Sequence, residues 1–163
     1  MSEGRPQLGE RGRPGFVEEW STGFTGSADR LGPVDYLNSD DGYRAVVCAT
    51  WLFCPETVEY RGGVFLLERF EADNVDDWLG RLDGAVDQAE DVVNETRLFD
   101  LFGNADIDTY GTGLARQVAT AVGECWQGIL ERRFPGRSVT VEVRDDDDGA
   151  YGPSLTFWTA PAR

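Results

Sequence analysis

The sequence predicts an α+β fold in which two strand hairpins enclose helices, in the order ββααββ. Three patterns predict it: two apolar runs before residue 71, two helical stripes between residues 75 and 134, and two short apolar runs after residue 138. Strands joined by short connections pair antiparallel, and helices between them cover one face of the sheet. We therefore expect a two-layer sandwich, with a mainly antiparallel sheet and two main helices on one face.

The first hairpin is predicted from the runs 43–53 and 64–70. The earlier run is apolar at successive positions, which is typical of a strand covered on both faces. Pro55 ends this run, and Gly62-Gly63 precede the second one. The short polar connection between them favours an antiparallel pair.

The two main helices are predicted from apolar residues at helical spacing. One stripe runs from Val75 to Val93, with acidic side chains on the opposite face. The other runs from Leu114 to Phe134 and stops at Pro135-Gly136, and a short helix is expected near 98–102. The alternating run 139–143, a turn, and the run 155–158 then predict the second hairpin.

We expect residues 1–32 to form a flexible N-terminal arm and residues 33–163 to form a single α+β domain. The first 15 residues are rich in glycine, proline and charges of both signs, so they can bury little apolar surface. Phe16, Val17, Trp20 and Phe24 would lie along one side of a short helix at 16–24. These side chains either dock on the domain or form a docking segment for a partner.

The charge of the chain limits the functions that it can perform. Histidine and lysine are absent, and the formal net charge is −15. Chemistry based on an imidazole or on a lysine Schiff base is therefore excluded. A field of this sign repels nucleic acid and anionic membranes, but it attracts a basic protein. The composition of a bacterial high-GC genome or adaptation to high salt would also produce an acidic protein.

The remaining composition predicts a cytoplasmic protein without cofactors or metals. No apolar run is long enough to span a membrane, and the polar N-terminus is unlike a signal peptide. Cys48, Cys54 and Cys125 are expected to be buried free thiols, because two lie in an apolar run and one lies on a helical stripe. Their spacing does not suit a zinc site.

The candidate binding residues are ten acidic groups and one aromatic residue. They are Asp76, Asp83, Asp87, Glu90, Asp106, Asp108, Asp145, Asp146, Asp147, Asp148 and Trp20. The aspartate run 145–148 does not have the spacing of an EF-hand calcium loop, so we expect a solvated turn there. Glu68, in an otherwise apolar run, is the best candidate for the carboxylate of an acid–base site.

Our preferred hypothesis is a non-catalytic acidic protein-binding domain that holds or neutralises a basic protein partner, as immunity proteins and inhibitors do. One alternative is a small enzyme or ligand-binding domain with a carboxylate-lined pocket between sheet and helices. Another is a structural subunit of a larger assembly, with residues 16–24 as its docking segment. The sequence identifies no catalytic motif.

Overall fold

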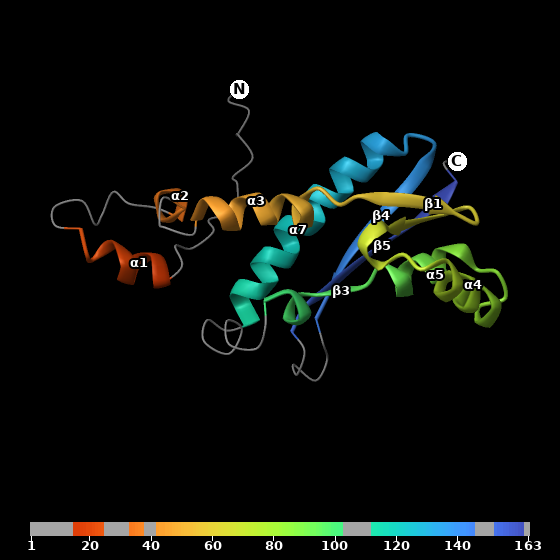
Figure 1. Cartoon of the computed structure of the whole chain (residues 1–163), viewed down its shortest axis with the longest axis horizontal. Coiled ribbons are helices and arrows are strands. Elements are labelled where there is room, and N and C mark those ends of the chain that lie inside the picture. The colour runs from red at the N-terminus through yellow and green to blue at the C-terminus, as the bar shows by residue number, and fades with distance from the viewer. Residues whose placement is uncertain (1–14, 25–32, 38–41, 103–111, 146–151, 162–163) are drawn as a thin grey trace, which may run out of the picture. The chain divides into compact units, whose positions relative to one another are not determined.

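The computed structural model describes residues 15–24, 33–37, 42–102, 112–145 and 152–161 (Figure 1). The chain divides into two compact units, Met1–Cys48 and Ala49–Arg163. The boundary expected at residue 32 falls inside the first unit, and residues 1–14 and 25–32 lie outside the described residues. The flexible arm at 1–32 therefore stays a prediction. No helix in the described ranges combines the length and apolar character that crossing a membrane requires.

The first unit contains the short helices α1 (Gly15–Ser21) and α2 (Pro33–Tyr36). The ring of Trp20 lies 4.9 Å from that of Phe24 and 5.3 Å from that of Tyr36. The expected helix near residue 16 is therefore present, and Trp20 packs against aromatic rings of its own unit.

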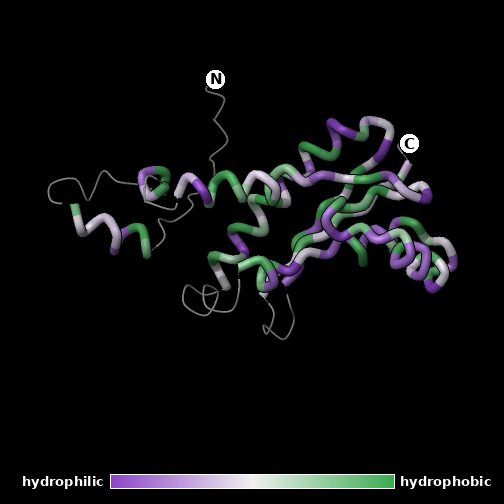
Figure 2. The backbone as a smooth tube through the Cα atoms, in the orientation of Figure 1, coloured by the Kyte–Doolittle hydropathy of each residue, from purple (hydrophilic) through white to green (hydrophobic). Residues whose placement is uncertain are grey.

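Residues 42–53 form a helix, α3 (Gly42–Phe53), so the strand predicted at 43–53 is wrong. The run is apolar at nearly every position, as the middle of this helix shows in Figure 2. Such a run has neither the period of a strand nor that of a helix, so periodicity could not separate the two. The helix has 12 residues, which exceeds the length of a usual strand.

The first sheet is the antiparallel hairpin of β1 (Thr57–Tyr60) and β2 (Gly63–Leu66), so the hairpin was predicted but its first strand was misplaced. Arg61 and Gly62 connect the strands, with φ of 51° and 86°. Two central residues with positive φ are the mark of a type I′ turn, whose twist matches that of paired strands. The short 3-10 helix η2 (Leu67–Arg69) replaces the strand expected to continue to Phe70.

Gly62→Ala is expected to lower the free energy of unfolding by about 1 kcal/mol, because a side chain at positive φ meets its own backbone. Gly80→Ala is the matched control. Gly80 lies inside a helix with open space around its Cα, so alanine there should stabilise the fold by about 0.5–1 kcal/mol. Urea unfolding of both variants measures the difference, and equal effects would contradict the turn assignment.

The helix predicted from 75 to 93 is two helices, α4 (Ala72–Arg81) and α5 (Val86–Val93). Asp83 and Gly84 between them have φ of 53° and 81°, a left-handed conformation that ends α4. The chain therefore turns at this point, and α5 packs against α4.

The second sheet has the strand order β3-β5-β4, with β3 (Thr96–Arg97), β4 (Arg137–Arg144) and β5 (Ser154–Pro161) all paired antiparallel. The helix α7 (Thr112–Arg133) precedes β4. The long helix and the second hairpin are therefore confirmed, as is a helical segment at 98–102.

The two groups of helices lie on opposite sides of β2. Val64 and Leu66 belong to the apolar cluster that includes Trp126 of α7. Phe65 belongs to a second cluster, with Val75 of α4 and Val93 of α5. Successive side chains of a strand point to opposite faces. Figure 1 likewise shows α7 and the α4–α5 pair on different sides of β4 and β5. The fold mixes helices with small antiparallel sheets, but a ββααββ sandwich with both helices on one face is not confirmed.

Two polar side chains join the two sheets along a seam between β2 and β5, which are not paired with each other. Glu90 of α5 accepts hydrogen bonds from the backbone N–H of Val64 at 2.6 Å and of Thr159 at 2.7 Å. Asn94 accepts one from the N–H of Leu66 at 2.9 Å and donates to the carbonyl oxygens of Val64 and Phe157. These side chains take the place of the hydrogen bonds that a continuous sheet would make.

Glu90 is fully buried, so its expected place on the exposed face of a helix is wrong. Burial raises the pKa of the Glu90 carboxyl above its ordinary value, and the hydrogen bonds from Thr159 and Val64 oppose that shift only in part. Helical periodicity places Glu90 on the polar side of α5 with Asp87. Asp87 is exposed, but Glu90 faces the unpaired strand edges.

Candidate functional site

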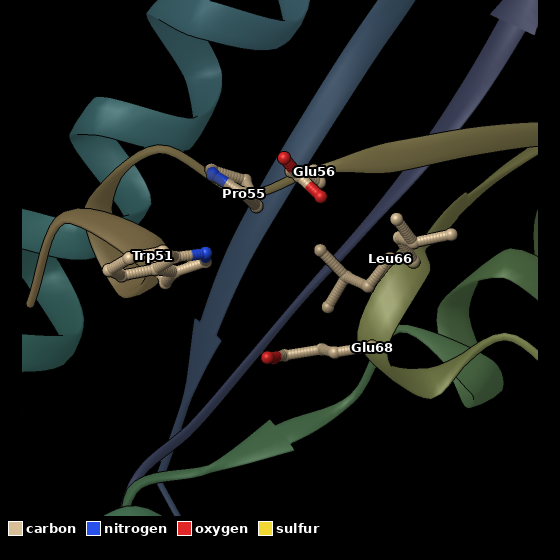
Figure 3. Close-up of a pocket in the computed structure, with 6 residues that line it drawn as sticks. Trp51, Pro55, Glu56, Leu66 and Glu68 are labelled. Carbon is tan, nitrogen blue, oxygen red and sulfur yellow. The ribbon is translucent and has the colours of Figure 1, made fainter. Parts of the chain in front are cut away.

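A small pocket lies between the end of α3 and the end of the first hairpin. Its lining residues are Trp51, Pro55, Glu56, Leu66, Leu67 and Glu68 (Figure 3). Its volume is about 130 Å³. All six residues belong to the second unit.

Backbone hydrogen bonds hold the two ends of the hairpin that form the pocket. The N–H of Leu67 donates to the carbonyl oxygen of Glu56 at 2.9 Å, next to the β1–β2 pair Thr57 and Leu66. This bond sets Glu56 and Leu67 opposite each other. Since Glu68 follows in η2, the hairpin positions both acidic residues of the pocket.

The wall formed by α3 is anchored to α7. The indole N–H of Trp126 donates to the carbonyl oxygen of Leu52 at 2.7 Å. Arg133 donates to the carbonyl oxygen of Pro55 at 2.8 Å. The first anchor is the backbone next to Trp51, and the second is the backbone of Pro55, next to Glu56. The segment that bears Trp51 and Glu56 is therefore fixed at two points.

The acidic and apolar side chains occupy different sides of the pocket. In Figure 3, Glu56 and Glu68 lie on opposite sides of the opening, and Trp51 lies across from Leu66. The carboxylate of Glu68 extends toward Trp51. The side chain of Trp51 is large and apolar, yet the residue is 62% exposed, and Leu67 is 48% exposed.

Neither pocket carboxylate forms an ion pair with a residue that the structure describes. Two neighbouring arginines have other partners. Arg69, next to Glu68 in sequence, donates to the hydroxyl of Thr96 at 3.1 Å. Arg133, which lines the adjoining hollow, donates to the carbonyl oxygen of Pro55 and to the hydroxyl of Thr57. Some other carboxylates of this unit are paired, as in Glu59 with Arg137. The pocket is thus acidic and without a cation among the described residues.

A second, more open hollow continues from this pocket. Glu56 and Leu67 belong to both, and the hollow is further lined by Thr57, Glu59, Arg133 and Phe134. Its volume is about 440 Å³. The pocket and the hollow therefore adjoin at Glu56, just before the start of β1.

The dimensions of the pocket favour a single side chain as its occupant. Sites for cofactors and small substrates usually enclose about 300–1,000 Å³, which is more than twice the volume found here. Glu68, the carboxylate singled out from the sequence, lines this pocket, which lies between α3 and the hairpin end. Glu56 and Glu68 are also both exposed, whereas acid–base chemistry draws on a desolvated group.

The acidic binding residues predicted from the sequence that the structure describes do not line this pocket. Asp76 lies on α4, where hydrogen bonds from Arg61 hold the pKa of its carboxyl below the ordinary value. Asp83 lies in the turn after α4, and Asp87 lies in the first turn of α5; both are exposed. Asp145, at the end of β4, pairs with Arg116.

Of the other predicted binding residues, the two that the structure describes are not among those that line the pocket. Glu90 is in the core, and Trp20 belongs to the first unit. Asp106, Asp108 and Asp146, Asp147 and Asp148 lie outside the described residues. Among the residues that the structure describes, no group of three potential ligands could hold a metal ion.

The three cysteines are free and exposed, so the prediction that they are buried is wrong. Cys48 and Cys54 lie on or just after α3, which is a helix exposing much of its surface instead of a covered strand. Cys125 lies in α7 between the buried Val122 and Trp126, on a side of the helix that stays in solvent.

Sequence reasoning identified Glu68 but missed Trp51 and Glu56. The signal was present for Trp51, since a helix over 43–53 places its apolar residues around the whole circumference and leaves some in solvent. No local sequence pattern marked Glu56 as a site residue. Only the hairpin places it next to Leu67, eleven positions along the chain.

Comparison of the chain with family models, with curated proteins and with solved structures finds no match. The geometry of the site must therefore carry the functional argument.

Proposed function

We propose that this protein is a non-catalytic binding domain that holds a basic protein partner. The observation that carries the proposal is the pocket at Trp51, in which two carboxylates without cationic partners among the described residues flank an exposed indole. Basic side chains have apolar stems and charged heads, and they match a pocket with apolar and acidic sides.

Two further features support a protein as the ligand. Tryptophan is enriched among the residues that dominate binding energy at protein interfaces, and the exposed Trp51 is in position to act as such an anchor. The formal net charge of −15 would steer a basic partner toward this protein and accelerate the encounter. An immunity-like or inhibitory role is one concrete form of such binding.

The double variant Glu56→Gln/Glu68→Gln is expected to weaken partner binding at least about ten-fold, since both charges that face the partner are removed. The experiment is a pull-down from the source cell with the full chain as bait, at low and high salt. The retained proteins are identified by mass spectrometry and scored for isoelectric point. A basic protein retained by the wild type at low salt is expected to be lost from this variant.

Asp73→Asn/Asp77→Asn is the matched control. Both residues are exposed on α4 and do not line the pocket, and their removal changes the net charge by the same amount. Retention of the basic protein by this control, together with its loss from the pocket variant, supports the proposal. The proposal is wrong if no basic protein is retained at low salt, or if both double variants behave alike.

A further inference from the structure

The pocket at Trp51 contains the same kinds of side chain that bind arginines elsewhere in this chain, but no arginine of the described residues occupies it. Arg144 lies over the ring of Trp158, with 5.9 Å between its guanidinium carbon and the ring centroid. The same guanidinium donates to Asp91 at 3.1 Å and to Glu142 at 2.7 Å. One indole and two carboxylates thus bind one arginine.

A second internal example uses the same chemistry with a tyrosine. The guanidinium of Arg61 lies 5.4 Å from the ring centroid of Tyr60 and donates to both carboxylate oxygens of Asp76, at 3.1 and 3.3 Å. An aromatic face together with carboxylate acceptors is therefore a recurrent arginine site in this protein.

The pocket has the same components and no arginine of its own among the described residues. Trp51 supplies the indole, and Glu56 and Glu68 supply the two carboxylates. From this correspondence, and resting on the proposed function, we propose that the pocket is a receptor for one arginine side chain of the basic partner protein.

Geometry favours arginine over lysine here. Glu56 and Glu68 lie on opposite sides of the opening, so a ligand must donate in two directions at once (Figure 3). Guanidinium is planar, has five N–H donors in a fixed fork and stacks on aromatic faces, whereas the ammonium of lysine is a compact and strongly hydrated charge. The apolar side formed by Leu66 and Leu67 would cover the arginine stem.

Charge and volume favour a cationic side chain as the occupant of the pocket. Two carboxylates repel phosphate and other anions, so an acidic peptide or a nucleic acid does not fit. A volume of about 130 Å³ accommodates one side chain better than a cofactor. The open hollow beyond Glu56 leaves room for the backbone that carries the arginine.

The probes that test this inference are three peptides, acetyl-Gly-Gly-Xaa-Gly-Gly-amide, in which Xaa is arginine, lysine or citrulline. Citrulline has the shape of arginine without its charge. The full chain is labelled with 5-fluorotryptophan, and the fluorine NMR signal of Trp51 is assigned from its loss in Trp51→Phe. The arginine peptide is expected to shift this signal and to bind at least about five-fold more tightly than the lysine peptide. The citrulline peptide is expected not to bind.

Variants separate the roles of the indole and the carboxylates. Trp51→Leu keeps an apolar wall but removes the fluorine reporter, so its peptide binding is measured by isothermal titration calorimetry beside the wild type. This variant is expected to lose the preference for arginine over lysine. Glu56→Gln and Glu68→Gln are each expected to weaken binding of the arginine peptide, while Asp73→Asn leaves it unchanged. All four residues are exposed, and an unchanged unfolding midpoint in urea confirms that each variant is folded.

Two outcomes would overturn the arginine receptor. If the arginine and lysine peptides bind equally at Trp51, the pocket binds cations without selecting arginine. The proposed function would then still stand. A Trp51 signal that no peptide shifts would remove the receptor itself, and the pull-down with the Glu56 and Glu68 variants would then decide the proposed function independently.

Discussion

Asn94→Ala is expected to lower the free energy of unfolding by about 4 kcal/mol. Asn94 is fully buried, and its amide satisfies the N–H of Leu66 and the carbonyl oxygens of Val64 and Phe157. Alanine leaves all three backbone groups in the core without a partner. Each unsatisfied buried group costs about 1–3 kcal/mol.

Urea unfolding at neutral pH measures this effect. Asn74→Ala is the matched control, because Asn74 is the same residue type in an exposed position of α4. The control is expected to stay within about 0.5 kcal/mol of the wild type. If Asn94→Ala lowers the free energy of unfolding by less than about 1 kcal/mol, water or other groups must bind the backbone N–H and carbonyl groups of the seam. That result would contradict the role given to this side chain.

Glu90→Ala is expected to cost about 3 kcal/mol at pH 5 and less at pH 8. The variant leaves the buried N–H groups of Val64 and Thr159 unpaired at any pH. At the higher pH, however, it also removes a carboxylate whose ionisation in the core is unfavourable, and this relief offsets part of the loss.

The sign of this pH dependence follows from the raised pKa of Glu90. Between the ordinary value of 4.5 and the folded value, the folded state binds more protons than the unfolded state. The stabilisation from protonated Glu90 is therefore complete below about pH 4.5 and is lost as the pH rises through the folded pKa. The difference between wild type and variant must accordingly shrink as the pH rises.

Urea unfolding of both proteins from pH 4.5 to 8.5 tests this trend, because effects of the other carboxyl groups cancel in the difference. Gln88→Ala, at an exposed and uncharged position of α5, is the control. Its difference from the wild type should stay small and constant. A Glu90→Ala difference that grows with pH would show that the carboxyl is stabilised as an anion, against the expectation.

Elements were predictable where one local pattern allowed a single interpretation. The stripe from Leu114 to Phe134 has one clean helical period, and α7 matches it to within about two residues. Residues 139–143 alternate strictly, and β4 contains them. The run 43–53 has no period, and there the strand assignment was wrong.

The break between α4 and α5 shows a different limit. The apolar residues keep helical spacing from Val75 to Val93, so periodicity alone predicts one helix. Asp83 and Gly84 were the indication that the helix ends between these residues, since both tolerate a left-handed backbone. Whether the chain turns there depends on the strands that α5 covers once it has turned.

The candidate site was predictable only in part, for a related reason. Glu68 stood out because it is a charged residue in an apolar run. Trp51 and Glu56 gained their significance from the hairpin, which sets Glu56 opposite Leu67, and from the anchoring of α3 to α7. Composition indicated an acidic binding protein but could not locate a site, because acidic residues are distributed along most of the chain.

The sequence by itself determined the charge of this protein, the absence of imidazole and lysine chemistry, the long helix and the terminal hairpin. These follow from composition or from local periods. The tertiary structure alone decided that Glu90 and Asn94 lie in the core, that the cysteines are exposed, and that Trp51 shares a pocket with two carboxylates. The physical reason is that burial depends on which surfaces meet, and residues far apart in the chain supply those surfaces.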